Sequence, residues 1–131
     1  MTAFLDSSVI VRYLTDDPPE MAERAARIIE TDEELILSEL VLVETAYVLE
    51  SVYRIERRAI VEAMQALVLR SNLRPHQLSK AAALQALELC RDSRRSSFVD
   101  AFQWALARYS SSRRIYSFDL RFPSEGIVVE G

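Results

Sequence analysis

The sequence predicts an α/β domain in which a central, mainly parallel sheet is covered by helices on both sides, a three-layer arrangement. Short apolar runs alternate with longer segments whose apolar residues recur every three or four positions, the pattern of parallel strands joined by helices. Half of the 131 residues are hydrophobic, which suffices for a real core. Only two glycines and four prolines occur and no linker interrupts the chain, so we expect one domain over residues 1–131.

The first half of the chain predicts two strand–helix units with a further helix between them. An apolar run at residues 3–5 is a candidate strand, and helical spacing follows over residues 9–14. The acidic and proline residues at 16–19 end this helix, and residues 20–30 have one apolar helical face. A second strand is predicted at residues 35–37, where Ser38 is a good N-cap for a long apolar helix over residues 39–53.

The second half predicts three helices and then two strands. Helical spacing covers residues 56–70 and 78–90, and we interpret residues 72–75 as a break between these helices. A helix over residues 96–109 follows, opened by Ser96 and Ser97. Residues 114–118 are a candidate strand closed by Asp119, and residues 127–129 a last one.

Composition excludes several classes of site. Two glycines cannot build the glycine-rich phosphate loops of P-loop or dinucleotide-binding proteins. Cys90 and His76 are the only residues of their kinds, so any metal must bind oxygen ligands. Cys90 falls on an apolar helix face, which favours a core position, and His76 follows Pro75 in a predicted loop. No signal segment and no apolar run of about 20 residues occurs, so we expect a cytoplasmic protein without a membrane span.

The basic residues are few but chemically uniform. The net charge of −4 argues against the broad positive field of a typical nucleic-acid binder. Lys80 is the only lysine, and arginine suits phosphate recognition better than lysine does. Arg91, Arg94 and Arg95 form a basic cluster, which is either a phosphate-binding segment or a solvated surface run.

Two aspartates follow predicted strands directly. In open parallel sheets the functional crevice lies outside the carboxyl ends of the strands, where Asp6 and Asp119 fall. Each also has an ordinary structural explanation, because aspartate caps helices and closes turns. Their shared placement favours a functional site.

Glu44 interrupts an apolar helix face formed by Leu40, Val41, Tyr47 and Val48. Ionised carboxylates are almost never buried without a partner. We therefore expect Glu44 to line a cleft or to meet a cation. The alternatives are a surface face or a pair with a distant arginine.

Asp100 falls in the first turn of its helix, where it fits a variant of the capping box with Ser97. It could equally point from the helix N-terminus into the crevice. Together, Asp6, Glu44, Asp100 and Asp119 predict a catalytic site that binds Mg²⁺ or Mn²⁺ through oxygen ligands. Because such ions activate water and neutralise phosphoryl oxygens, we infer hydrolysis of phosphodiester bonds.

Four segments of the chain resemble motifs of PIN-domain proteins, particularly the VapC-type ribonuclease toxins. Residues 4–14 resemble the opening of the family, and residues 38–49 place Glu44 on its second acidic position. Residues 98–101 and 117–119 place Asp100 and Asp119 on the third and fourth. The resemblance covers nearly the whole chain.

This resemblance implies a Mg²⁺- or Mn²⁺-dependent endoribonuclease that acts on RNA, is inhibited by a small cognate antitoxin protein and forms a homodimer. Ser8 stands where many members have asparagine, and Ser97 where many close relatives carry a further aspartate. The number of bound metals therefore stays open, and so does an alternative function as a catalytically weakened binding module acting through a protein partner. A phosphoaspartate enzyme is disfavoured, because Ser8 replaces the second aspartate of the dehalogenase type and Lys80 does not match the receiver lysine.

Overall fold

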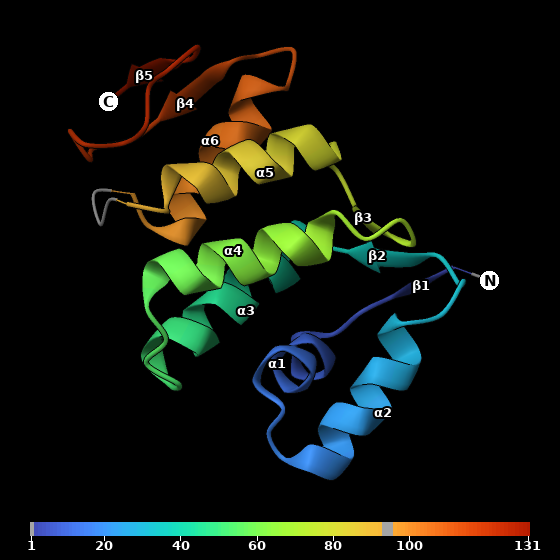
Figure 1. Cartoon of the computed structure of the whole chain (residues 1–131). Coiled ribbons are helices and arrows are strands. Elements are labelled where there is room, and N and C mark those ends of the chain that lie inside the picture. Colours follow the sequence, from blue (N-terminus) through green and yellow to red (C-terminus); the bar gives the residue numbers. More distant parts are fainter. Residues whose placement is uncertain (1, 93–95) are drawn as a thin grey trace.

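The computed structural model describes residues 2–92 and 96–131. Within them lie six helices and five short strands (Figure 1). In chain order they are β1 (Ala3–Phe4), α1 (Ser7–Thr15), α2 (Pro19–Ile29), β2 (Leu35–Leu37), α3 (Glu39–Ser51), α4 (Arg57–Val68), β3 (Leu73–Pro75), α5 (Lys80–Leu89), α6 (Phe98–Arg108), β4 (Arg114–Tyr116) and β5 (Val128–Glu130). No helix of this described part is long and apolar enough to cross a membrane.

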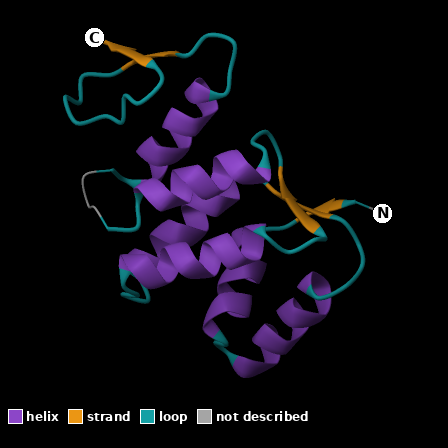
Figure 2. Ribbon diagram, turned by 45° about the horizontal axis from the view of Figure 1, so that its top comes forward, coloured by secondary structure: helices purple, strands orange, loops and turns teal. Residues whose placement is uncertain are grey.

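The predicted α/β class with parallel strands is confirmed, but the strands form two sheets. The first sheet has the order β1-β2-β3, and both pairs are parallel, with Ala3 opposite Leu35 and Leu35 opposite Leu73. Strands β4 and β5 form a second parallel pair, with Ile115 opposite Val129. Figures 1 and 2 both show this pair beside α6, away from β1. Strand β1 is therefore an edge of its sheet.

The interpretation of residues 72–75 as a mere break between helices is wrong, because Leu73–Pro75 form strand β3. The strand is too short to show a period of two, and only the exposed Arg74 between two buried residues indicates it. Pairing with β2 stabilises it, since the Leu35 amide donates to the Asn72 carbonyl at 2.8 Å. Tertiary contacts thus decide the conformation of this segment.

Serine residues define where three helices begin. Ser38, Ser79 and Ser97 precede α3, α5 and α6, and each hydroxyl accepts a hydrogen bond from the backbone amide three residues later, at 3.0–3.2 Å. These bonds satisfy amides that have no partner within the helix. The prediction that Ser38 caps the long apolar helix is confirmed.

Helix α3 is central, since it packs against α1, α4 and α6 (Figure 2). Its buried face includes Leu42, Ala46 and Leu49, which are at most 1% exposed. Cys90 is fully buried in the same core, as predicted. Burial raises the pKa of this thiol to about 11, so it stays protonated near neutral pH and is no nucleophile.

Glu39 is a largely buried carboxylate at the start of α3 that the sequence did not single out. Its side chain accepts hydrogen bonds from the backbone amides of Gln77 and Leu78, at 3.0 and 2.9 Å. These bonds connect the segment between β3 and α5 to the first turn of α3. The helix N-terminus adds a favourable interaction with the negative charge.

Replacing Glu39 by alanine is expected to lower the free energy of unfolding by about 1–3 kcal/mol, because two amide donors lose an ionised acceptor at a largely buried place. Urea denaturation followed by circular dichroism measures the change. Glu20→Ala also removes a carboxylate from the first turn of a helix, but Glu20 is exposed, so its effect should stay within about 0.5 kcal/mol. Equal losses in the two variants would assign the effect of Glu39 to the helix dipole alone.

Candidate functional site

Asp6 lies at the junction of β1 and α1, where the sequence predicted a site residue. Its Oδ2 accepts hydrogen bonds from the Ser8 amide at 3.1 Å and from the Ser8 hydroxyl at 2.5 Å, so it caps α1. These bonds, the hydroxyl above all, hold the pKa of this exposed carboxyl below its ordinary range. Asp6 is therefore an ionised carboxylate whose orientation the following helix defines.

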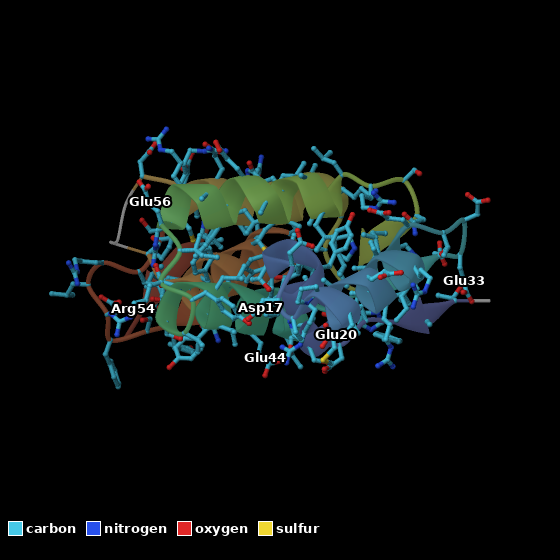
Figure 3. The ribbon with its side chains drawn as sticks, turned by 60° about the horizontal axis from the view of Figure 1, so that its bottom comes forward. Asp17, Glu20, Glu33, Glu44, Arg54 and Glu56 are labelled. Carbon is cyan, nitrogen blue, oxygen red and sulfur yellow. The ribbon has the colours of Figure 1, made fainter. Side chains whose placement is uncertain are left out.

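Glu44 is connected to the same junction. The Ser7 hydroxyl donates a hydrogen bond of 2.6 Å to Glu44 Oε1, which places a carboxylate of α3 beside the first turn of α1. Of the apolar residues around it, Leu40 and Tyr47 are 84% and 67% exposed, whereas Val41 and Val48 are half-buried. Figure 3 shows Glu44 pointing outward from α3. Glu44 therefore lies at the surface, and its hydrogen-bond partner among the described residues is the Ser7 hydroxyl rather than a cation.

Asp100 lies in the first turn of α6, half-buried. Its amide donates to the Ser97 hydroxyl at 3.0 Å, which is one half of the predicted capping box. Val99 and Val43, the sequence neighbours of Asp100 and Glu44, line one cavity of about 370 Å³. Helices α6 and α3 therefore border the same cavity, but Asp100 and Glu44 are not among the residues that line it.

Asp119 follows β4, as predicted, but that strand is not a neighbour of β1. Asp119 Oδ1 accepts a hydrogen bond from the Arg121 amide at 2.9 Å, the turn-closing role that the sequence left open. The indole Nε1 of Trp104 donates to the Glu125 carbonyl at 2.8 Å, which ties the loop after Asp119 to α6. The structure thus connects Asp6 and Glu44 to the first turn of α1, whereas β4, which precedes Asp119, lies in a separate sheet away from β1 (Figure 1).

The donor set fits a hard divalent cation. Among residues 2–92 and 96–131, no three His, Cys, Asp or Glu side chains lie close enough to hold a metal ion together. Asp6 and Glu44 nevertheless supply two carboxylates, with the Ser7 and Ser8 hydroxyls next to them. Mg²⁺ is commonly held by one or two carboxylates, with waters and substrate phosphates as its other ligands. The chemistry of these oxygen donors therefore fits such an ion.

Sequence reasoning missed the connecting role of Ser7, although the polar triplet between β1 and α1 was its available signal. The predicted basic cluster is only partly described. Arg91 forms ion pairs with Glu88 and Glu62, at 3.0 and 3.3 Å, so it belongs to a surface network of charges. Arg94 and Arg95 lie outside the described residues.

The chain was compared with models of known protein families. The family model described as PIN domain matches residues 3–125, which include all four predicted carboxylates. A comparison with curated proteins gave no match.

Replacing Ser8 by alanine is expected to raise the pKa of Asp6, because it removes the hydroxyl that contributes most to the lowered value. Carbon-13 NMR titration of the side-chain carboxyl measures this pKa. Because the pKa of Asp6 is lower in the folded protein than in the unfolded chain, its ionised carboxylate stabilises the fold at pH values above the unfolded-state pKa. This stabilisation is lost as the pH falls through the folded-state pKa. Between these two pKa values, the free energy of unfolding of Ser8→Ala should therefore depend less on pH than that of the wild type.

Ser7→Ala is the matched control for this titration, since it removes one neighbouring hydroxyl and leaves both bonds from Ser8 to Asp6 in place. An Asp6 pKa that is equally low in wild type and Ser8→Ala would contradict the assignment. The remaining backbone amides would then be sufficient to keep the carboxylate ionised.

Proposed function

The chain belongs to the PIN domain family, and from this premise we propose that it is a metal-dependent endoribonuclease that acts as the toxin of a toxin–antitoxin pair. PIN domains are generally metal-dependent nucleases, so the family supports a hydrolase that uses a divalent metal ion. The observation that carries the proposal is that Glu44 and Asp6 accept hydrogen bonds from two adjacent serine hydroxyls, Ser7 and Ser8, in the first turn of α1. We propose Mg²⁺ or Mn²⁺ as the ion.

Each residue at this junction has a definite part in the proposed reaction. A divalent cation bound here supplies an activated water and neutralises charge on the phosphoryl oxygens. Asp6 remains ionised, because Ser8 stabilises its negative form, and so it can hold the cation throughout the physiological pH range. Ser7 orients Glu44 as the second ligand. We propose that Asp100 supplies a further carboxylate from α6, and we include Asp119 on the sequence pattern.

We propose two protein partners besides the RNA substrate. A second copy of the chain and a small cognate antitoxin both require exposed apolar surface, which distinguishes interaction sites from ordinary solvated faces. Leu40 and Tyr47 provide such surface on either side of Glu44, and Phe118 and Leu120 provide more beside Asp119, at 93% and 100% exposed. A partner on the α3 face would cover the proposed site.

One observation favours a second candidate function. Within the described residues, no three His, Cys, Asp or Glu side chains are grouped closely enough to hold a metal ion. A PIN-like module that binds RNA or protein without turnover fits this arrangement. The nuclease proposal rests on the family, and the activity test separates the two.

The purified chain is expected to cleave single-stranded RNA loops when Mg²⁺ or Mn²⁺ is present and to be silent in chelator. Asp6→Asn and Glu44→Gln should each lower the cleavage rate by more than about 100-fold, because even the residues that support metal ligands contribute up to this factor. Asp32→Asn, which changes an exposed carboxylate in the loop before β2, should leave the rate unchanged. Gel analysis of end-labelled RNA measures all four proteins.

Cleavage that survives both chelation and Asp6→Asn would indicate a contaminating enzyme. RNA binding without cleavage, under every divalent ion and with the antitoxin absent, would establish the binding-module alternative.

The free protein is expected to self-associate through the exposed face of α3, because Leu40 and Tyr47 leave large apolar surfaces in water. Sedimentation velocity should give a dimer at micromolar concentration and a monomer for the double variant Leu40→Glu, Tyr47→Glu. Leu69→Glu at the end of α4 is the matched control, since this leucine is 62% exposed and lies on another helix. A sharp monomer mass for the wild type across this range would contradict the homodimer.

A further inference from the structure

A cavity of about 210 Å³ lies between α1 and α2, next to the proposed active site. Its volume is several times the roughly 30 Å³ that a water molecule occupies in the liquid. Two arginines, Arg12 of α1 and Arg24 of α2, line it together with Ser8, and Met21 and Ile28 supply apolar wall. The cavity therefore combines two cations and a hydroxyl within one small space.

Neither arginine has a counter-ion in the part of the chain that the structure describes. The Nε of Arg12 is buried without a hydrogen-bond partner. Arg24 forms no ion pair with Glu20, although these residues have the spacing of neighbours on a helix. Arg27, one turn further along α2, is paired with Glu23 at 2.9 Å. Two guanidinium groups that line one small cavity without a counter-ion repel each other, so their shared placement points to a bound anion.

The cavity shares a residue with the carboxylate site. Ser8 lines it and also donates to Asp6. Arg12 lies four residues after Ser8 in α1, hence on the same helix face and about 6 Å along the axis. An anion held by Arg12 and Arg24 would therefore lie next to a substrate bound at Asp6.

We propose that this cavity binds a backbone phosphate of the RNA strand, adjacent to the phosphate that is cleaved. The inference rests on the proposed function, because the position beside Asp6 is what favours nucleic acid over a carboxylate of a protein partner. Guanidinium groups bind phosphate oxygens through two parallel hydrogen bonds, and two of them can hold one phosphate in a fixed orientation. Contacts to the backbone position a strand without reading its bases, so the site should not select sequence.

The test measures binding of a fluorescein-labelled single-stranded RNA by anisotropy, with the full chain in chelator, where the proposed enzyme is silent. Arg24→Gln is expected to weaken binding about 10-fold, which corresponds to the loss of one charge-assisted contact. The slope of log affinity against log salt should become less steep by about 0.7, the value for one phosphate contact with a single strand. Arg24→Lys should fall between Arg24→Gln and wild type, because it keeps the charge and loses the paired donors.

Arg27→Gln is the matched control, since it changes the net charge equally on the same helix but removes an arginine that already has a partner. Its RNA affinity and salt slope should equal those of the wild type. Equal effects of Arg24→Gln and Arg27→Gln, or no effect of Arg24→Gln, would overturn the phosphate site. A variant Arg24→Gln that binds RNA normally but self-associates less would assign the cavity to a protein contact instead.

The binding experiment tests the phosphate site whether or not the protein cleaves RNA. If no divalent ion supports cleavage while binding still depends on Arg24, the phosphate site stands and the nuclease proposal fails. If RNA is cleaved while binding does not depend on Arg24, the nuclease proposal stands and the phosphate site fails. Thermal unfolding followed by circular dichroism should give equal melting temperatures for both glutamine variants, because each replaces an exposed side chain.

Discussion

Backbone pairing on both edges of β2 places the elements that carry the site. All three residues of β2 are buried, and its carbonyls accept from both neighbours: Ile36 from the Leu5 amide at 3.0 Å and Leu37 from the His76 amide at 3.1 Å. The first of these bonds sets the end of β1, where Asp6 follows. Helix α3, which carries Glu44, begins two residues after β2 ends, at Glu39. Asp6 thus follows strand β1 directly, and Glu44 lies in the helix that follows β2, so the pairing of these two strands helps to position both carboxylates.

Side-chain hydrogen bonds then orient the two carboxylates whose positions follow from this backbone pairing. Ser8 fixes Asp6 and Ser7 fixes Glu44, so two adjacent residues at the start of α1 control both carboxylates. An N-cap and an acidic ligand are therefore not competing explanations of Asp6, because the bonds that cap the helix also keep the carboxylate ionised. Asp6 can therefore cap α1 and serve as an ionised carboxylate of the candidate site at the same time.

The sequence predicted much of this site because its signals are local. A polar residue directly after an apolar run indicates a strand end, and this identified Asp6. The surroundings of Glu44 were harder to predict, since α3 is apolar on most of its circumference and the pattern does not reveal which face is buried. Leu42, Ala46 and Leu49 belong to that face, whereas Leu40 and Tyr47, on either side of Glu44, lie in solvent.

Long-range pairing was the part that the sequence could not specify. Strand β3 has three residues and becomes a strand through β2. Strand β4 was found correctly from its apolar residues, but its partner depends on contacts far along the chain, and it pairs with β5 alone. The position of Asp119 relative to Asp6 follows from that pairing, and a pattern of strands and helices carries no information about it.

The net charge of −4 averages over pairs that cancel, so it does not describe the local charges of the surface. Several arginines of this acidic chain are neutralised locally, as Arg27 is by Glu23 and Arg114 by Glu130. Such exposed pairs contribute little to stability and little to the field beyond their neighbourhood. Arg12 and Arg24 have no such partner among the described residues, so their charge acts on whatever occupies the cavity beside Asp6. In the phosphate site proposed above, these two charges would attract a polyanion to the cavity beside Asp6.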